Sequence, residues 1–177
     1  MTSTFSGETQ TRHDLFTRRH LLLAGAAASV FTFDPTGVVA ETKPVVIAHN
    51  RTAEGAQMAF TPAVTRIMPA TTVQFTHADR GHNFQSFDNM LPAGAAVFEG
   101  AIGEELDITF TDEGIYGYFC KPHQMMGMIG YVLVGDFTRN LDAVRSASAA
   151  LRGPMMASRV AAYMDEINAI GQAEGLL

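Results

Sequence analysis

The chain has 177 residues, of which 47% are hydrophobic and 17% are charged, and its formal net charge is -6 at pH 7. This length accommodates one ordinary domain with an appended segment, and the composition excludes a disordered or collagen-like chain. The acidic balance excludes a nucleic-acid partner, and the single cysteine, Cys120, excludes an intramolecular disulfide, a CxxC redox pair and a four-cysteine zinc site.

The first forty residues have the pattern of an export signal. The pair Arg18-Arg19 leads into an uncharged run from Leu21 to Phe33, which is shorter than the roughly 20 apolar residues of a membrane-spanning helix, and Val38-Val39-Ala40 follows. Residues 1–40 are therefore predicted to be a signal peptide that resembles twin-arginine signals, with a general secretory signal as the alternative. Either route predicts a periplasmic protein, residues 41–177, with no membrane segment.

Residues 42–135 have the periodicity of short strands separated by Gly, Pro, Asn and Asp. Apolar and polar residues alternate from Leu106 to Thr111, which is typical of a half-buried strand. The other predicted strands are Val45 to Ala48, Thr72 to His77, Ile115 to Cys120 and Met128 to Val134. Tyr116, Tyr118 and Cys120 share one face. Many short strands at this spacing predict a mainly β sandwich or barrel.

After Gly135 the pattern changes to that of helices. Thr138 is the predicted N-cap of a short helix, and Gly153-Pro154 separates that helix from a longer one. The predicted buried stripe of the longer helix is Met156, Val160, Tyr163, Met164, Ile167 and Gly171 or Ile170. Its methionines are interpreted as core residues. Arg159, Asp165 and Glu166 are expected to lie off the stripe.

Three side chains with metal-ligand chemistry occur within nine residues, around the predicted loop from Lys121 to Gly127. They are the Cys120 thiol, the His123 imidazole and the Met128 thioether. Two imidazoles and a thiolate with a weak axial thioether form the ligand set of blue-copper electron-transfer centres. The pattern therefore predicts a copper site and requires a second histidine.

His82 is the leading candidate for that second histidine. It follows the strand that ends at His77, and it sits beside Gly81, which allows the chain to turn sharply. His49 and His77 remain alternatives, although each lies within a strand pattern where a ring would pack or face solvent.

Four motifs together resemble the pseudoazurins over about residues 42–170. They are Cys120-x-x-His123-x-x-x-x-Met128, Gly81-His82-Asn83, Ala53-Glu54-Gly55-Ala56 leading to Phe60-x-Pro62-Ala63, and Val134-Gly135-Asp136 before two helices. Plastocyanins share the Cys-to-His-to-Met spacing but lack those helices. The resemblance implies a Greek-key cupredoxin β-sandwich with two C-terminal α-helices. It also implies one type 1 copper ion, held by His82, Cys120, His123 and axial Met128.

The resemblance further implies a function. The protein would be a monomeric one-electron carrier and not an enzyme, and its partners would be redox proteins such as copper nitrite reductase in denitrification. A small apolar docking patch is expected around His123, formed by Pro122, Met125 and Met126 unless the two methionines fold inward. The expected cations at its edge are Lys121, Arg80 and Arg139.

Three features depart from the family pattern. Lys121 stands where pseudoazurins have a hydroxyl residue that bonds to the asparagine after the first histidine, here Asn83, which puts that loop-to-loop bond in question. The usual Pro-Gly-Asp turn is Pro69-Ala70-Thr71. Pseudoazurins commonly have a lysine-rich face around the copper, whereas residues 41–177 contain only two lysines, Lys43 and Lys121. This predicts weaker electrostatic steering towards an acidic partner.

Two other function classes compete with electron transfer. A copper-trafficking protein would use exposed, exchangeable Met or Cys ligands for Cu(I). A hydrolase would use Cys120 as nucleophile with His82 or His123 as base, but no motif for an oxyanion site or a substrate cleft accompanies them.

Overall fold

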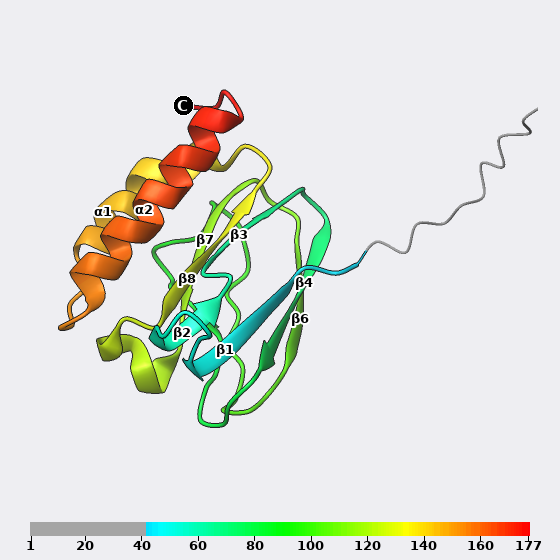
Figure 1. The fold of residues 1–177 in the computed structure, drawn as a ribbon. Coiled ribbons are helices and arrows are strands. Elements are labelled where there is room, and N and C mark those ends of the chain that lie inside the picture. The colour runs from blue at the N-terminus through cyan, green and yellow to red at the C-terminus, as the bar shows by residue number, and fades with distance from the viewer. Residues whose placement is uncertain (1–41) are drawn as a thin grey trace, which may run out of the picture. The chain divides into compact units, whose positions relative to one another are not determined.

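The computed structural model describes residues 42–177, so the predicted signal peptide lies outside the described residues. These residues form two packed four-stranded sheets, in the orders β2-β1-β4-β6 and β3-β8-β7-β5, with two helices on one outer face (Figure 1). The predicted mainly β sandwich with two C-terminal helices is confirmed. No helix in residues 42–177 is long and apolar enough to cross a membrane.

The elements differ from the sequence prediction at a few places. The strands are β1 (Val45–Arg51), β2 (Gln57–Thr61), β3 (Val64–Ile67), β4 (Thr71–His77), β5 (Gln85–Ser86), β6 (Leu106–Phe110), β7 (Gly114–Phe119) and β8 (Ile129–Val134). The helices are the 3-10 turns η1 (Lys121–Met126) and η2 (Phe137–Asn140), then α1 (Leu141–Ala149) and α2 (Met156–Ala173). The short strands β2, β3 and β5 were not predicted, and the predicted loop after Cys120 contains η1.

Strand pairing brings distant parts of the chain together. β1 pairs in parallel with β4, and β3 pairs in parallel with β8, where Val64 lies opposite Tyr131. The remaining ladders are antiparallel, and β7 and β8 pair along their whole length, from Gly114 opposite Val134 to Phe119 opposite Ile129. The end of β7 and the start of β8 therefore lie side by side at one end of the sandwich.

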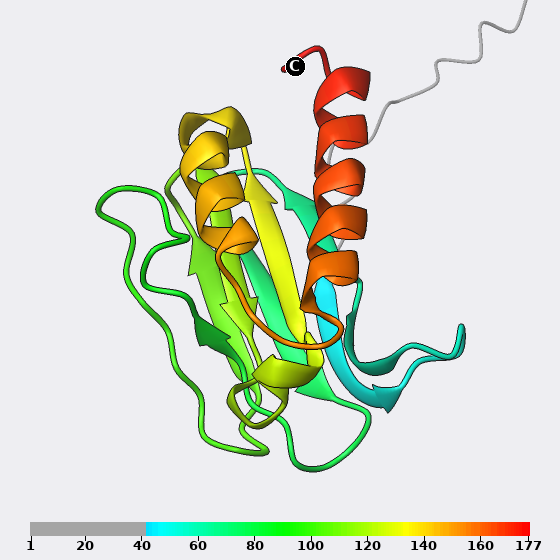
Figure 2. The ribbon, with the colours of Figure 1, turned by 90° about the vertical axis from the view of Figure 1, so that its left-hand side faces the viewer.

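Two hydrophobic cores share the second sheet. The first lies between the sheets and contains the aromatic rings of Phe60, Phe75, Phe84, Phe110, Tyr116 and Tyr118. The second lies between the second sheet and the helices and includes Ile115, Tyr131, Leu133, Val144 and Ile167. Figure 2 shows both helices over this sheet and the α1–α2 connection reaching towards the end of the sandwich that carries η1. Every residue of β8 is consequently buried.

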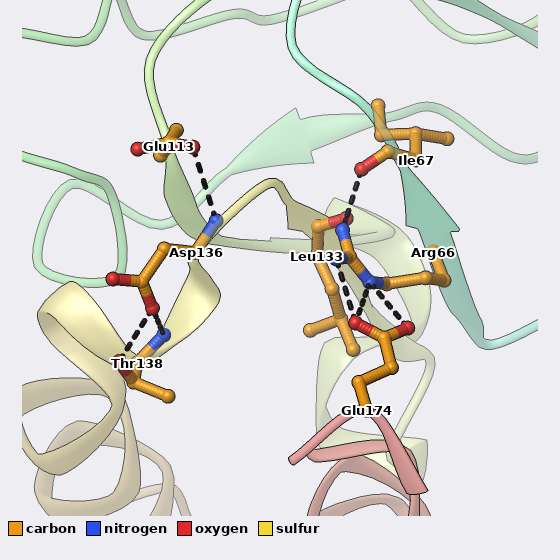
Figure 3. Close-up of polar contacts among 7 residues, drawn as sticks. All are labelled: Arg66, Ile67, Glu113, Leu133, Asp136, Thr138 and Glu174. Carbon is orange, nitrogen blue, oxygen red and sulfur yellow. Dashed lines mark hydrogen bonds and ion pairs between the residues drawn. The ribbon is translucent and has the colours of Figure 1, made fainter. Parts of the chain in front are cut away.

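The start of the helical region corrects one prediction. The Asp136 carboxylate accepts hydrogen bonds from the Thr138 backbone N–H at 3.2 Å and from its hydroxyl at 2.5 Å (Figure 3). Thr138 lies within η2, and α1 begins later, at Leu141. The predicted N-cap role of Thr138 is therefore wrong, because the neighbouring carboxylate caps η2 in its place.

Helix α2 corrects a second prediction. Arg159, expected to lie off the buried stripe, is only 8% exposed. It lies three residues after Met156 and four before Tyr163, and residues at these spacings share one helix face. Asp165 and Glu166 are exposed, as expected.

Candidate metal centre

Cys120 enters the site directly from β7. Alternation along this strand points Tyr116, Tyr118 and Cys120 into the core between the sheets, where the cysteine is fully buried. This confirms the predicted shared face. The thiol position is thus fixed by a strand that is paired on both sides, with β8 and β5.

The turn that follows Cys120 folds back on itself. Pro122 lies in the first turn of η1, where a missing backbone N–H is tolerated, and Gly127 caps the end of η1 with a φ of 80° that favours glycine. The Cys120 N–H donates to the Met128 carbonyl at 3.0 Å, and the Met128 N–H donates to the His123 carbonyl at 3.2 Å. These bonds place Met128 beside Cys120, and its side chain is fully buried in the same core.

His82 reaches the site from a second loop. Gly81 before it has a φ of 94°, so the predicted sharp turn at this glycine is confirmed. The His82 carbonyl accepts a hydrogen bond from the Gly103 N–H at 2.8 Å, and the His82 side chain is fully buried. The loop after β4 therefore holds the ring inside the molecule and away from solvent.

Three ligand atoms converge at this end of the sandwich. The Cys120 Sγ lies 3.6 Å from Nδ1 of His82 and 3.4 Å from Nδ1 of His123, and the two Nδ1 atoms are 3.2 Å apart. Metal bonds of roughly 2.0 Å to nitrogen and 2.3 Å to sulfur can join atoms at such separations through a single ion. The donor set, two imidazoles and a thiol with a buried thioether close by, fits copper.

The protonation state of His82 favours a metal on this ring. Burial first, and then the positive charge of a protonated His123, lower the pKa of His82 to about 4, so this ring is neutral at pH 7. Burial raises the pKa of the Cys120 thiol, although backbone hydrogen bonds from Asn83 and His123 act in the opposite direction. Metal binding therefore releases the thiol proton.

Asn50 orients the His82 ring, and the sequence did not reveal this residue. Its side-chain Oδ1 lies 3.1 Å from Nε2 of His82, while its backbone N–H donates to Asp79 at 2.7 Å. If Nε2–H donates to Asn50, then Nδ1 carries the lone pair that faces Cys120. No local sequence motif pointed to this residue, which lies 32 positions before His82.

The structure contains the loop-to-loop bond that Lys121 puts in question. The backbone N–H of Lys121 donates to Oδ1 of Asn83 at 2.7 Å, and Nδ2 of Asn83 donates to the Gly100 carbonyl at 3.1 Å. The Lys121 ammonium lies 3.4 Å from the Glu99 carboxylate. The bond thus needs no side-chain hydroxyl, because the main chain supplies the donor.

The alternative histidines lie outside the cluster. His77 packs against Phe84 with the two rings tilted by 39° and their centroids 4.9 Å apart, and its Nε2 lies 2.9 Å from the Glu104 carbonyl. His49 lies opposite Ala59 in the β1–β2 ladder. Among residues 42–177, the metal-competent group contains only His82, Cys120 and His123.

Arg139 is not at the edge of the expected docking patch. Its guanidinium pairs with Glu113, which directly precedes β7, and with Asp136, which follows β8. Cys120 and Met128 lie at the opposite ends of these two strands. The predicted place of Arg139 is therefore wrong, since the sequence did not show that β8 carries the chain across the whole sandwich.

Comparison with known proteins places this geometry in a family. Residues 47–135 match the copper binding proteins of the plastocyanin/azurin family. The chain is 38% identical over 128 residues to pseudoazurin of Paracoccus pantotrophus, covering 72% of this chain and 86% of that one. It is 36% identical over 121 residues to pseudoazurin of Methylorubrum extorquens, covering 68% and 82%.

The fold agrees with the sequence comparison. The structure is similar to the refined crystal structure of pseudoazurin from Methylobacterium extorquens AM1, with a TM-score of 0.65 and 34% identity, covering 71% of this chain and 98% of that one. The convergent His-Cys-His cluster has the donor set that copper requires. The chain therefore belongs to the pseudoazurins, copper-binding members of the plastocyanin/azurin family.

Proposed function

We propose that this protein is a periplasmic one-electron carrier whose copper is held by His82, Cys120 and His123, with Met128 as the axial ligand. The observation that carries the proposal is the convergence of two Nδ1 atoms and one Sγ within 4.8 Å of one another. Copper bound there would supply two oxidation states that differ by one electron. No substrate is converted, so the protein is a carrier and not an enzyme.

The chain's part in this function is to hold the ligands still. Cys120 and Met128 are joined by a backbone hydrogen bond at the adjoining ends of β7 and β8, and the His82 ring is bonded to Asn50. Asn83 links the two ligand loops through the Lys121 N–H. A framework that fixes its ligands limits their rearrangement when the charge of the centre changes.

His123 is the proposed port for electrons. It is partly exposed, whereas His82 and Cys120 are fully buried. Met125 is 61% exposed and Met126 is 36% exposed on the same short turn, which supports an outward-facing apolar patch over the inward-folded alternative. A small apolar surface suits the brief encounters of redox proteins.

The proposed partner is a periplasmic oxidoreductase, such as a copper nitrite reductase, which the protein meets as a monomer. The charge at the patch supports an encounter with little electrostatic steering, because Lys121 is paired with Glu99. A low dependence of the association rate on ionic strength is therefore expected. Export by the predicted signal, residues 1–40, would place the carrier beside such enzymes.

The competing functions fit the site less well. A hydrolase needs an accessible thiolate, but Cys120 is fully buried and burial raises the pKa of its thiol. A copper-trafficking protein needs exposed, exchangeable ligands, whereas His82, Cys120 and Met128 are all fully buried.

A copper titration of residues 41–177 tests the proposal. Added Cu(II) should produce an intense visible thiolate-to-copper band that bleaches on reduction. Cys120→Ser should abolish the band, and Met128→Leu should retain copper while changing the reduction potential. A folded protein that develops no such band would contradict the electron-carrier proposal.

Electron-transfer kinetics test the docking patch. Met125→Glu should slow bimolecular electron transfer to the partner enzyme and leave the copper spectrum unchanged, because the side chain is exposed on the surface. Met68→Glu is the matched control, since Met68 is 67% exposed in the segment between β3 and β4. Equal rates for the two variants would refute the patch.

A further inference from the structure

Arg159 is a buried cation held entirely by main-chain carbonyls. Its Nη1 donates to the Gly127 carbonyl at 2.9 Å and to the Met58 carbonyl at 2.5 Å, and its Nη2 donates to the Gln57 carbonyl. None of the ion pairs found in residues 42–177 includes it. A guanidinium without a carboxylate depends on such dipoles for its stabilisation, so these three contacts fix its position.

The first contact lies at the edge of the metal site. Gly127 directly precedes Met128, and a Cβ added at Gly127 would lie 3.0 Å from Cδ of Arg159. The glycine therefore leaves room for the arginine stem as well as adopting its left-handed φ. By donating to the Gly127 carbonyl, Arg159 holds the main chain at the residue directly before Met128, the proposed axial ligand.

The other two contacts are made to strand β2. Gln57 and Met58 belong to β2, and Met58 has a φ of 45°, which is unusual for a residue with a side chain. Arg51 pairs with Gln57 and His49 with Ala59, so Met58 lies across from Asn50.

Asn50 is also the residue that contacts His82. Its Oδ1 lies 3.1 Å from the His82 Nε2, on the strand that faces Met58. The contacts of one guanidinium therefore reach both the segment that carries Met128 and the strand pair that orients His82.

We propose that Arg159 is a positioning residue of the copper site, which joins the Met128 segment to the β1–β2 pair and so sets the distance of the axial thioether. This inference rests on the ligand set proposed above. The planar guanidinium suits this role because it can donate in several directions at once, whereas a lysine ammonium would hold the three carbonyls less rigidly.

The test compares Arg159→Met and Arg159→Lys with Arg66→Met. Arg66 also fastens α2 to the sheet, through Glu174 at 2.8 Å, but at the other end of the helix (Figure 3). The readouts are amide hydrogen exchange of Met128 in the metal-free protein, the intensity ratio of the visible copper bands, and the reduction potential.

The Arg159→Met variant should accelerate exchange of the Met128 amide by about tenfold, as expected for loss of hydrogen bonds from a charged donor. It should also shift the band ratio and the potential. Arg159→Lys should fall between this variant and the parent, whereas Arg66→Met should lower the melting temperature and leave the three site readouts unchanged. If Arg159→Met does not fold, Arg159→Lys against Arg66→Met decides the question.

The outcomes separate this inference from the function on which it rests. If Arg159→Met lowers stability but leaves the Met128 exchange, the band ratio and the potential as in the parent, the positioning role is refuted while the blue-copper site stands. If the parent gives no thiolate-to-copper band, the proposed function fails. Exchange of the Met128 amide in the metal-free protein then decides whether Arg159 holds this segment.

Discussion

The two sheets of the sandwich differ in how they are covered. All six residues of β8 are buried, because the first sheet covers one face and the helices cover the other. β6 in the first sheet alternates between intermediate and exposed positions before Phe110, since only one of its faces meets the core. Cys120 and Met128 extend from the doubly covered sheet. His82 follows β4, and its partner Asn50 lies in β1, both strands of the singly covered sheet.

The metal site therefore lies between the second sheet, which is covered on both faces, and the first sheet, which is covered on one face only. A fully packed interior resists displacement of its side chains, whereas a strand with one solvated face has fewer contacts to hold it. We infer that the thiolate and thioether positions are the better fixed pair, and that the position of His82 depends on a few specific hydrogen bonds. Four predictions test this contrast.

The largest expected effect is a difference in stability loss between truncations of core side chains in the two sheets. Leu133→Ala in β8 should lower the free energy of unfolding by about 3–4 kcal/mol, because the side chain is fully buried under the helices. Ile108→Ala in β6 should cost only about 1 kcal/mol, since this residue is partly buried. Urea denaturation of the metal-free protein measures both. Similar losses for the two variants would contradict the contrast.

The second effect is a pH dependence of the metal-free protein. The pKa of His82 is lowered to about 4 by burial, against 6.5 for an ordinary histidine, so the unfolded chain binds the proton first as the pH falls. Stability should therefore be fully present above pH 6.5 and should fall by on the order of 2–3 kcal/mol towards pH 4. His82→Gln should flatten this part of the curve, and an unchanged slope would show that the ring is not effectively buried.

The third effect concerns the hydrogen bond that orients His82. Asn50→Ala should weaken copper binding by about tenfold, the lower end of the usual effect of losing a partner behind a metal ligand, because Asn50 is itself exposed. Competition with a copper chelator measures the affinity. Arg51→Ala, at the next and also exposed position of β1, should leave the copper affinity unchanged. An equal loss of affinity in this variant would show that the effect comes from disturbing β1 and not from losing the hydrogen bond to His82.

The smallest effect concerns the turn between β3 and β4. Ala70, which replaces the usual glycine, has a φ of 64°, in the left-handed region that disfavours a side chain. Ala70→Gly should raise the stability by roughly 0.5–1 kcal/mol and leave the copper spectrum unchanged. Ala93→Gly, at an exposed position that has no positive φ, is the control and should not stabilise the protein.

The sequence predicted the parts of the fold that depend on local patterns. Alternation identified β6 and β7, and the face shared by Tyr118 and Cys120 was correct because a strand repeats every two residues. Strand β2 was missed, since its alternation is short and is interrupted by the left-handed residue Met58. No local rule predicts such a conformation at a methionine.

The site was predictable in its chemistry and less so in its supports. Ligand types and spacing pointed to His82, Cys120 and His123, which the structure brings together. The residues that hold them, Asn50 and Arg159, act across long stretches of chain. Arg159 was placed on the solvent side because charged residues usually lie there, and its carbonyl partners lie up to 102 positions away.

The parallel pairing of β3 with β8 bears on how the protein is made. Val64 lies opposite Tyr131, so this ladder can close only when the polypeptide has been synthesised well beyond the cysteine. Long-range ladders form late and slowly, and the order of assembly follows the order of synthesis only for local contacts. A nascent chain that ends before residue 129 contains His82, Cys120 and His123 but lacks strand β8, which pairs with β7 beside them. The native arrangement of these three side chains therefore depends on a strand that is synthesised after all of them.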